Sequence, residues 1–430
     1  MTFTDEFLPD RRALLRGAAM IAAAGAVLPT TGIAAAAATD ADELFKKGEF
    51  DEAARGYRRL LREDPENAHA SAQLGYIALL SNRFAAAERH LSTATTLDPG
   101  DVASRQRLAE CYVRQDQLAR AVPLLQKTGR PRDAAYATLY AHVTGTPWQL
   151  HGAQSTRVPF ETIEPLPAVK AEVNGRTKTF YLDTYATLDL AQDVAEEAGL
   201  RSLATLSGVA SNNPVTIHLG VLESFRIGDI EVRNVPVQWI DAQRPPLPDG
   251  SQPAGVLGTT LFYHFLATMD YAGQALVLRR KSATRGKGAG RLPLWLAGDH
   301  FPCTLGSLGD YGPRIVTLDT GGLGHGLDTT VEYAERAGLK VDYDHPIEKN
   351  GVPFYPVTPE RISLGRAVGR NVRGFASAKT IPGQPGPGQA GMFGFEIIAN
   401  FTHEFFKPFA VTFDYTGMNV HITRGVPERP

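Results

Sequence analysis

Two loops that carry an aspartate followed by a threonine are the residues best suited to chemistry. Asp319-Thr320 and Asp183-Thr184 lie 136 residues apart, and each follows a run of apolar or β-branched residues. Such a run predicts a strand that delivers its carboxylate into a tight loop. Gly321 continues the later loop and lets the backbone turn sharply. We therefore expect Asp183 and Asp319 to meet at one site.

Paired carboxylates have a specific chemistry. Two such groups close together cannot both be fully ionised, so they share one proton over a useful pH range. The ionised member takes a proton from an attacking water, and the protonated member donates to a carbonyl oxygen. The two apparent pKa values belong to the pair, and the sequence does not assign the proton to either aspartate. This chemistry hydrolyses an amide without a metal or a cofactor, and we expect neither.

The strands that position these loops belong to a duplicated region. After Trp148 the sequence consists of short β-like runs separated by Gly, Pro and Asn turns, which predicts an all-β architecture. Matched segments recur in the same order at nearly constant offset, which indicates an internal duplication. The matches pair 227–235 with 364–372, 255–258 with 391–394, 268–271 with 412–415, and 198–200 with 337–339.

This order resembles the retropepsin-like and pepsin-like aspartic peptidases over residues 157–424. In that family each lobe supplies one Asp-Thr/Ser-Gly loop, and a later apolar-apolar-Gly turn passes beneath it. Val256-Leu257-Gly258 and Met392-Phe393-Gly394 match that second motif. The resemblance implies that Thr184 and Thr320 join the two loops by hydrogen bonds. It also implies that Gly321 brings its backbone close to the catalytic carboxylate.

Two positions depart from the family pattern. Tyr185 stands where the first loop of the family has Gly, and Gly322-Leu323 stands where the second has Ala-Ser/Thr. A Tyr side chain could crowd the partner loop, and a backbone that suits Gly would strain it. The interpretation that follows is a peptidase-like fold that binds peptides without cleaving them. Because both aspartates are present, we favour an active enzyme.

An all-α helical repeat precedes the β region. Alanines recur every 34 residues at Ala53, Ala87 and Ala121, and Pro65 and Pro99 share the same spacing. The period and the small residues resemble the tetratricopeptide repeat, with a capping helix expected over 132–143. Such repeats present a concave face to a peptide or partner protein, and a plain scaffold is the alternative.

The first 38 residues predict an export signal. Arg11-Arg12 begins a segment that resembles the twin-arginine motif, an uncharged stretch follows over 17–33, and small residues over 34–38 offer a cleavage site. We expect export by the twin-arginine route to the periplasm, the cell envelope or the exterior, with only transient contact with the membrane. The net charge of −2 disfavours nucleic-acid binding, since the basic blocks are limited to the short runs 279–281 and 285–287.

Other chemical candidates are weaker. Asp270 and Asp414 each precede Tyr and then a Gly, which predicts hairpin turns in which Asp caps backbone amides. His325 lies close to the second aspartate loop, and we interpret it as an exposed loop residue. Cys111 and Cys303 are distant in sequence, and we expect no disulfide between them.

We therefore predict a multidomain chain: tetratricopeptide-like helical repeats, then a mainly β, bilobed aspartic-peptidase-like domain. The predicted boundaries are 1–38 for the signal, 41–150 for the repeats, 157–281 and 292–424 for the lobes, and 282–291 for a linker. The predicted function is that of an exported aspartic-type endopeptidase that cleaves peptides or proteins, with a further protein partner on the repeats. The alternatives are an inactive peptide-binding protein and a structural or assembly factor of the envelope.

Overall fold

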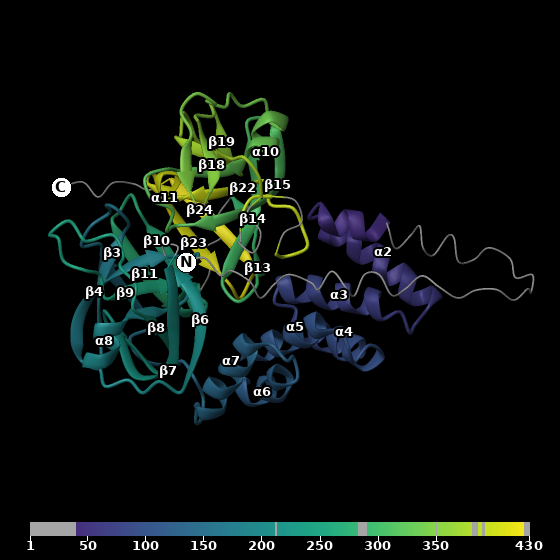
Figure 1. The fold of residues 1–430 in the computed structure, drawn as a ribbon, viewed down its shortest axis with the longest axis horizontal. Coiled ribbons are helices and arrows are strands. Elements are labelled where there is room, and N and C mark those ends of the chain that lie inside the picture. The colour runs from purple at the N-terminus through teal and green to yellow at the C-terminus, as the bar shows by residue number, and fades with distance from the viewer. Residues whose placement is uncertain are drawn as a thin grey trace, which may run out of the picture.

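The computed structural model describes residues 40–210, 213–282, 290–349, 351–380, 386–388 and 392–424 (Figure 1). The predicted export signal and most of the predicted linker lie outside these residues. Among the residues described, no helix is both long and apolar enough to span a membrane. Both cysteines are free and buried, as expected.

The N-terminal part is a stack of antiparallel helices. Residues 40–46 are helical, and the helices that follow are α2 (Phe50–Glu63), α3 (Ala68–Leu80), α4 (Phe84–Leu97), α5 (Val102–Val113), α6 (Leu118–Gln126) and α7 (Pro131–His142). The three repeated alanines, Ala53, Ala87 and Ala121, are fully buried between helices. The small residue Gly75 lets α3 and α4 approach, because a Cβ there would lie 2.6 Å from Leu91. Helix α7 is the predicted capping helix.

All the strands of an eight-stranded sheet lie within residues 149–258. In spatial order its strands are β1 (Gln149–Gly152), β8 (Ile230–Ile240), β5 (Asp189–Ala191), β9 (Gly255–Gly258), β4 (Arg176–Asp183), β3 (Ala168–Val173), β7 (Asn213–Ile227) and β6 (Ala204–Ala210). Two short helices, α8 (Gln192–Glu197) and α9 (Thr259–Phe262), follow β5 and β9. Strand β4 ends at Asp183 and pairs in parallel with β9.

A ten-stranded sheet repeats this arrangement. Its main path is β17 (Ile347–Lys349), β18 (Val352–Val357), β21 (Gly374–Ser377), β16 (Leu327–Thr330), β22 (Ala399–Thr402), β15 (Tyr311–Asp319), β14 (Phe301–Leu308), β19 (Ile362–Leu364) and β20 (Ala367–Gly369), and β13 (Trp295–Ala297) pairs with β14. Helices α10 (Val331–Arg336) and α11 (His403–Phe406) match α8 and α9. Strand β15 ends at Asp319 and pairs in parallel with β22.

A six-stranded sheet joins the two halves. It contains β12 (Arg291–Pro293), β24 (Asn419–Arg424), β23 (Phe409–Asp414), β10 (Phe265–Asp270), β11 (Ala275–Arg280) and β2 (Ser155–Pro159). The matched residues Thr268 and Thr412 are direct partners in the β10–β23 pairing, and their hydroxyls lie 2.8 Å apart. Two duplicated strands that pair through equivalent residues are related by an approximate two-fold axis. The duplication predicted from the sequence is therefore a structural symmetry.

Matched residues also share backbone conformation. Gly228 and Gly365 have φ of +54° and +56°, and Asn234 and Asn371 have φ of +56° and +51°. Left-handed backbone favours Gly and tolerates Asn, so these turns explain why the residues recur. Asp270 and Asp414 occupy hairpin turns as predicted: they accept hydrogen bonds from the backbone amides of Gly273 and Gly417 at 2.9 and 2.8 Å.

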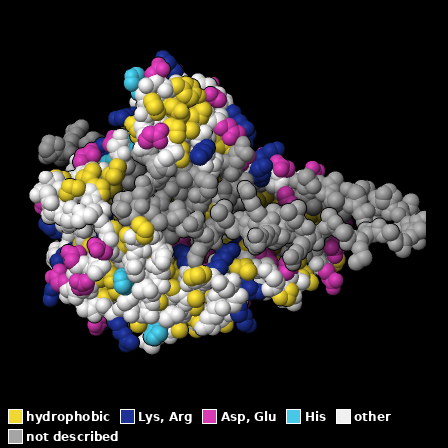
Figure 2. All heavy atoms as spheres, in the orientation of Figure 1, with side chains coloured by type: hydrophobic (Ala, Val, Ile, Leu, Met, Phe, Trp, Pro, Cys, Tyr) yellow, Lys and Arg dark blue, Asp and Glu magenta, His cyan; other side chains and the backbone are white. Residues whose placement is uncertain are grey.

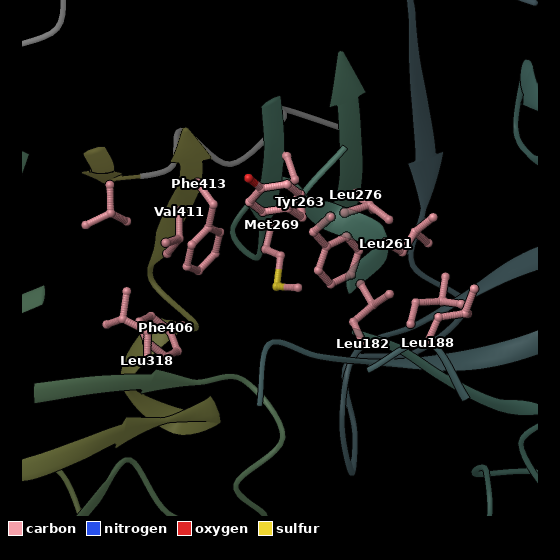
Figure 3. Close-up of a cluster of buried hydrophobic side chains, with 14 of the residues drawn as sticks. Leu182, Leu188, Leu261, Tyr263, Met269, Leu276, Leu318, Phe406, Val411 and Phe413 are labelled. Carbon is pink, nitrogen blue, oxygen red and sulfur yellow. The ribbon is translucent and has the colours of Figure 1, made fainter. Parts of the chain in front are cut away.

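One buried core supports both aspartate loops. Leu182 and Leu318, the residues before the two aspartates, are fully buried in the same hydrophobic cluster as Met269 and Val411 of the six-stranded sheet (Figure 3). Burial of such side chains contributes roughly 1.5–3 kcal/mol each. The loops are therefore anchored at their base.

The helical repeats pack directly on the β region. Arg114 at the end of α5 donates to the Leu296 carbonyl at 3.1 Å, and its own carbonyl accepts from the Tyr263 hydroxyl at 3.1 Å. A second core cluster combines Phe45 and Phe50 with Phe395 of the β region. The surface mixes acidic and basic side chains over both parts, with no face of a single charge in the view shown (Figure 2).

Candidate functional site

The two aspartate loops are joined by reciprocal hydrogen bonds between their threonines. The Thr184 amide donates to Thr320 Oγ1 at 2.9 Å, and the Thr320 amide donates to Thr184 Oγ1 at 3.1 Å. The Thr184 hydroxyl donates to the Leu318 carbonyl at 2.7 Å, and the Thr320 hydroxyl donates to the Leu182 carbonyl at 3.5 Å. Both threonines are fully buried. The structure thus brings together the residues that the sequence singled out.

Each aspartate is oriented by its own loop. Asp183 Oδ1 accepts from the Tyr185 amide at 2.6 Å, and Asp319 Oδ1 accepts from the Gly321 amide at 2.8 Å. Gly321 also lies directly against Asp183, because a Cβ at this position would collide with the Asp183 carboxylate. The predicted close approach of Gly321 to a carboxylate is therefore present, and it occurs across the two loops.

Asn400 is a site residue that sequence reasoning missed. It lies on β22, where its side-chain amide donates to Asp319 Oδ2 at 2.8 Å. The Thr317 hydroxyl donates to Asn400 Oδ1 at 2.8 Å, which orients the amide with its nitrogen toward the aspartate. The matching position on β9 is Val256, which has no polar side chain.

Burial and mutual repulsion perturb both carboxyl groups. Burial raises the pKa of Asp183, and the charge of Asp319 raises it further. Burial also raises the pKa of Asp319, but the hydrogen bonds from Asn400 and Gly321 oppose that shift. Donors to a carboxylate favour its ionised form. The asymmetry therefore favours a proton on Asp183 and a negative charge on Asp319.

The element beneath the second loop differs from the one predicted. The sequence predicted Met392-Phe393-Gly394, but β22 lies beside Asp319, with Thr402 opposite it. In the first half Gly258 of β9 is opposite Asp183. Phe393 instead packs against the helical repeats, where its carbonyl accepts from the Tyr76 hydroxyl at 3.1 Å. The prediction was wrong because the chain between the matched strands is longer in the second half.

Each half has one glycine where the aspartate loop contacts the neighbouring strand, but it lies on the strand in the first half and on the loop in the second. Gly258 has no room for a side chain, because a Cβ there would collide with the Ala186 backbone. In the second half Gly322 matches Ala186 and Thr402 matches Gly258, so the residue with the side chain is now on the strand. A Cβ on Gly322 would lie 2.5 Å from the Thr402 side chain. Gly322, a departure from the family pattern, is thus the partner that makes space for Thr402.

Tyr185 does not adopt the strained backbone that the sequence suggested. It is not among the residues with positive φ. Its ring packs on Phe301, with centroids 4.8 Å apart, and joins the core cluster shared with α2 and α3. Burial raises the pKa of its hydroxyl well above the usual value. Tyr185 therefore links the first aspartate loop to the core beneath the helical repeats.

His325 is buried, contrary to the prediction of an exposed loop residue. Its Nδ1 lies 2.7 Å from the Leu323 carbonyl, its Nε2 lies 2.8 Å from Asp328, and only 4 % of its surface is exposed. Its carbonyl accepts from the Thr402 hydroxyl at 2.6 Å. His325 thus fixes the loop after Asp319.

The hairpin of β6 and β7 is a further element that carried no sequence motif. The two strands pair from Ala204 opposite Leu219 to Ala210 opposite Asn213. Near its base, Ile217 and Leu219 share a hydrophobic cluster with Leu139 of α7. The last helix of the repeats therefore supports this hairpin.

The comparisons with known proteins match the two parts of the chain separately. Residues 169–261, which include Asp183, match the aspartyl protease family. Residues 39–102 and 78–143 match two families of tetratricopeptide repeat. With the structure, these matches show tetratricopeptide-like repeats followed by a mostly β, aspartic-protease-like domain, as the sequence predicted.

A search of curated proteins found no match. Among solved structures, a mutant O-GlcNAc transferase of Thermobaculum terrenum is 21% identical over 28% of this chain and 24% of its own, with a TM-score of 0.26. The TPR2B domain of yeast Sti1, in a complex with pHsp70, is 22% identical over 24% of this chain and 80% of its own, with a TM-score of 0.22. MamA of RS-1 is 17% identical over 24% of this chain and 62% of its own, with a TM-score of 0.23.

Proposed function

We propose that the chain is an aspartic-type endopeptidase that hydrolyses peptide bonds with Asp183 and Asp319. The observation that carries this proposal is the reciprocal pair of hydrogen bonds between Thr184 and Thr320, which holds two carboxylates on opposed loops. The contact of Gly321 with the Asp183 carboxylate supports the same conclusion. A structural role alone would not require two half-buried acids that repel each other.

The proposed reaction begins with Asp183 protonated and Asp319 ionised. Asp319 takes a proton from water as the water oxygen attacks the peptide carbonyl carbon, and Asp183 donates its proton to the carbonyl oxygen. The resulting diol collapses when the C–N bond breaks: the nitrogen takes the proton from Asp319, and a diol hydroxyl returns a proton to Asp183. The starting protonation is restored, and no covalent intermediate forms.

The Asn400 amide favours this division of roles. Its hydrogen bond to Asp319 Oδ2 stabilises the ionised base, and charge-assisted bonds of this kind are stronger than neutral ones. The backbone amides that bond each Oδ1 hold both carboxylates in position before substrate arrives. The substrate would lie extended between the two halves, held by main-chain hydrogen bonds like an added strand.

A mixed peptide library tests the proposal. Full-length wild type and an Asp183→Asn, Asp319→Asn double variant are incubated with the library from acidic to neutral pH, and products are identified by mass spectrometry. We expect internal cleavage by the wild type alone. If the wild type binds peptides but cleaves none at any pH, the proposal is wrong and the chain is a peptide-binding protein.

We also propose export by the twin-arginine route, on the basis of Arg11-Arg12 and the uncharged stretch that follows. Cell fractionation of the wild type and of an Arg11→Lys, Arg12→Lys variant tests this proposal. We expect the paired variant to stay inside the cell, while Arg16→Lys serves as the matched control. Equal distribution of the wild type and the paired variant would contradict it.

A further inference from the structure

A cluster of side chains that can bind a metal ion lies where the two halves of the β region meet. Glu164 belongs to the segment between β2 and β3 in the first half, and His403 and Glu404 begin α11 in the second half. Each residue offers one ligand atom, and these atoms all lie within 4.8 Å of one another. His403 Nε2 lies 3.9 Å from Glu164 Oε2. One ion could therefore contact all three residues.

The buried ring of His403 is the observation that points to a ligand. Its side chain is fully buried, and neither ring nitrogen has a hydrogen-bond partner among the residues that the structure describes. Burial lowers the pKa of His403 to about 4, and the charge of Lys407 adds to that shift. Glu404, Glu164 and the Ile163 backbone oppose it. The ring is therefore neutral at neutral pH, which is the form that binds a metal ion.

The ammonium group of Lys407 bridges the two carboxylates of this cluster. It donates to Glu164 Oε1 and, at 2.7 Å, to Glu404 Oε1. One ammonium balances one of the two negative charges and leaves His403 without a partner. A divalent ion would balance both charges and bind the imidazole as well. The Lys407 side chain is 28 % exposed, so its flexible stem can turn toward solvent when an ion enters.

The equivalent contact on the other side of the two-fold axis already contains a cation. The turn that includes Glu164 is equivalent to residues 296–302 of the second half, because the strands that flank each turn pair in the same register. There the guanidinium of Arg114 donates to two carbonyls of the turn, and the Arg114 carbonyl accepts from Tyr263. Tyr263 follows α9 as Lys407 follows α11. The repeats thus supply a cation at one contact, whereas at the other the exposed Glu164 carboxylate is open to an ion from solution.

We propose that Glu164, His403 and Glu404 bind a divalent transition-metal ion of the Zn²⁺ class, which links the two halves of the β region. Zn²⁺ takes imidazole and carboxylate ligands at about 2.0–2.2 Å, usually four in all, and water would supply the fourth. His403 directly follows Thr402, the residue opposite Asp319, so the ion would brace the strand beside the second aspartate loop. The role is structural, and the binding does not depend on the proposed peptidase function.

Isothermal titration calorimetry with ZnCl₂ at neutral pH tests the proposal on the tag-free full chain, after treatment with a chelator and dialysis. We expect one Zn²⁺ per chain, bound at least about tenfold more weakly by Glu164→Gln and by His403→Gln. Glu164 is exposed, so Glu164→Gln remains informative if the buried change at His403 disturbs the fold. Lys407→Met should bind Zn²⁺ more tightly than the wild type, because it removes the competing ammonium.

His345→Gln is the matched control. His345 is an exposed histidine whose Nδ1 lies 3.0 Å from the Asp342 carboxylate, so it resembles an adventitious surface site for metal ions. Its replacement should leave the affinity for Zn²⁺ unchanged. A loss in His345→Gln as large as that in Glu164→Gln would mean an adventitious ion only, and would overturn the proposal.

Thermal unfolding provides a second measurement. An ion that binds only the folded protein stabilises it, so Zn²⁺ should raise the Tm of the wild type and have a much smaller effect on Glu164→Gln. Circular dichroism establishes that each variant is folded before its affinity is compared. The proposal is overturned if the wild type binds no Zn²⁺, or if folded Glu164→Gln and His403→Gln bind it as tightly as the wild type.

Discussion

Asn400 donates a hydrogen bond to Asp319 Oδ2 at 2.8 Å, whereas the matching residue beside Asp183 is Val256. This difference makes the side-chain hydrogen bonding of the two carboxylates asymmetric. It makes Asp319 easier to ionise than Asp183, although burial raises the pKa of both. A symmetric pair of loops can thereby supply one base and one acid.

Asn400→Val should move the acid limb of activity to higher pH. The substitution removes the donor that stabilises ionised Asp319, so the pKa of Asp319 rises. The pair then loses its first proton only at a higher pH. A hydrogen bond to a charged group contributes about 1.5–3 kcal/mol, which corresponds to roughly one to two pH units. A profile of kcat/KM against pH measures the shift. An unchanged acid limb in a folded variant would exclude this role for Asn400.

Gly321→Ala should abolish activity and destabilise the protein. The added Cβ would collide with the Asp183 carboxylate, so one loop must move. Overpacking of this kind costs about 1–3 kcal/mol, and displaced catalytic groups lose at least about 100-fold in rate. Activity assays and urea denaturation measure both effects. Gly386→Ala is the control, because nothing lies within 4 Å of its added Cβ, and an equal effect there would contradict this explanation.

Gly322 and Thr402 should be coupled energetically. Gly322→Ala alone brings a Cβ to 2.5 Å from the Thr402 side chain, and we expect a loss of about 1–3 kcal/mol in the free energy of unfolding. Thr402→Gly alone also destabilises, because it removes the hydrogen bond to the His325 carbonyl. In the double variant the clash is absent. Its loss in the free energy of unfolding should therefore be smaller than the sum of the losses in the two single variants. Strict additivity in a double-mutant cycle would contradict the exchange of bulk.

Tyr185→Gly should not improve the enzyme, although it restores the family residue. The substitution removes a ring that packs on Phe301 and leaves a cavity between the first loop and the core beneath the repeats. We expect a loss of roughly 2–4 kcal/mol in stability and lower activity. Tyr185→Phe keeps the ring and should retain most of both. Faster cleavage by a stable Tyr185→Gly variant would show that Tyr185 obstructs the site.

The aspartate loops were predictable because their signal is local. A short apolar run, Asp-Thr and Gly specify a strand and a tight loop, and the resemblance supplied the bonds between Thr184 and Thr320. Asn400 and Thr402 were missed because strand pairing is non-local. The sequence analysis matched Val256-Leu257-Gly258 to Met392-Phe393-Gly394 with the offset of 136 that separates the two aspartates. Asp270 and Asp414, which come after these motifs, are 144 residues apart. The larger offset aligns Thr402 with Gly258, and it would have identified β22.

The packing of the repeats on the β region could not be read from the sequence. The 34-residue period predicts that helices pair, but it does not say what their other faces contact. Tyr185 looked like a defect because its partner, Phe301, lies 116 residues away and belongs to the other half of the β region. Its role depends on tertiary contacts that no local pattern encodes.

The central claim is that Asp183 and Asp319 act as one unit, and single Asn variants test it most directly. Peptide cleavage by wild type, Asp183→Asn and Asp319→Asn is compared, with the fold of each checked by circular dichroism and denaturation. We predict that each single variant loses at least about 1,000-fold in kcat/KM, because neither an acid nor a base works alone. Burial and repulsion raise the pKa of Asp183 to about 8, so the unfolded chain loses this proton first and stability falls as the pH rises from about 4 to about 8. Above that range Asp183→Asn should be at least as stable as wild type. A folded single variant that keeps more than about a tenth of wild-type activity would contradict the two-carboxylate mechanism.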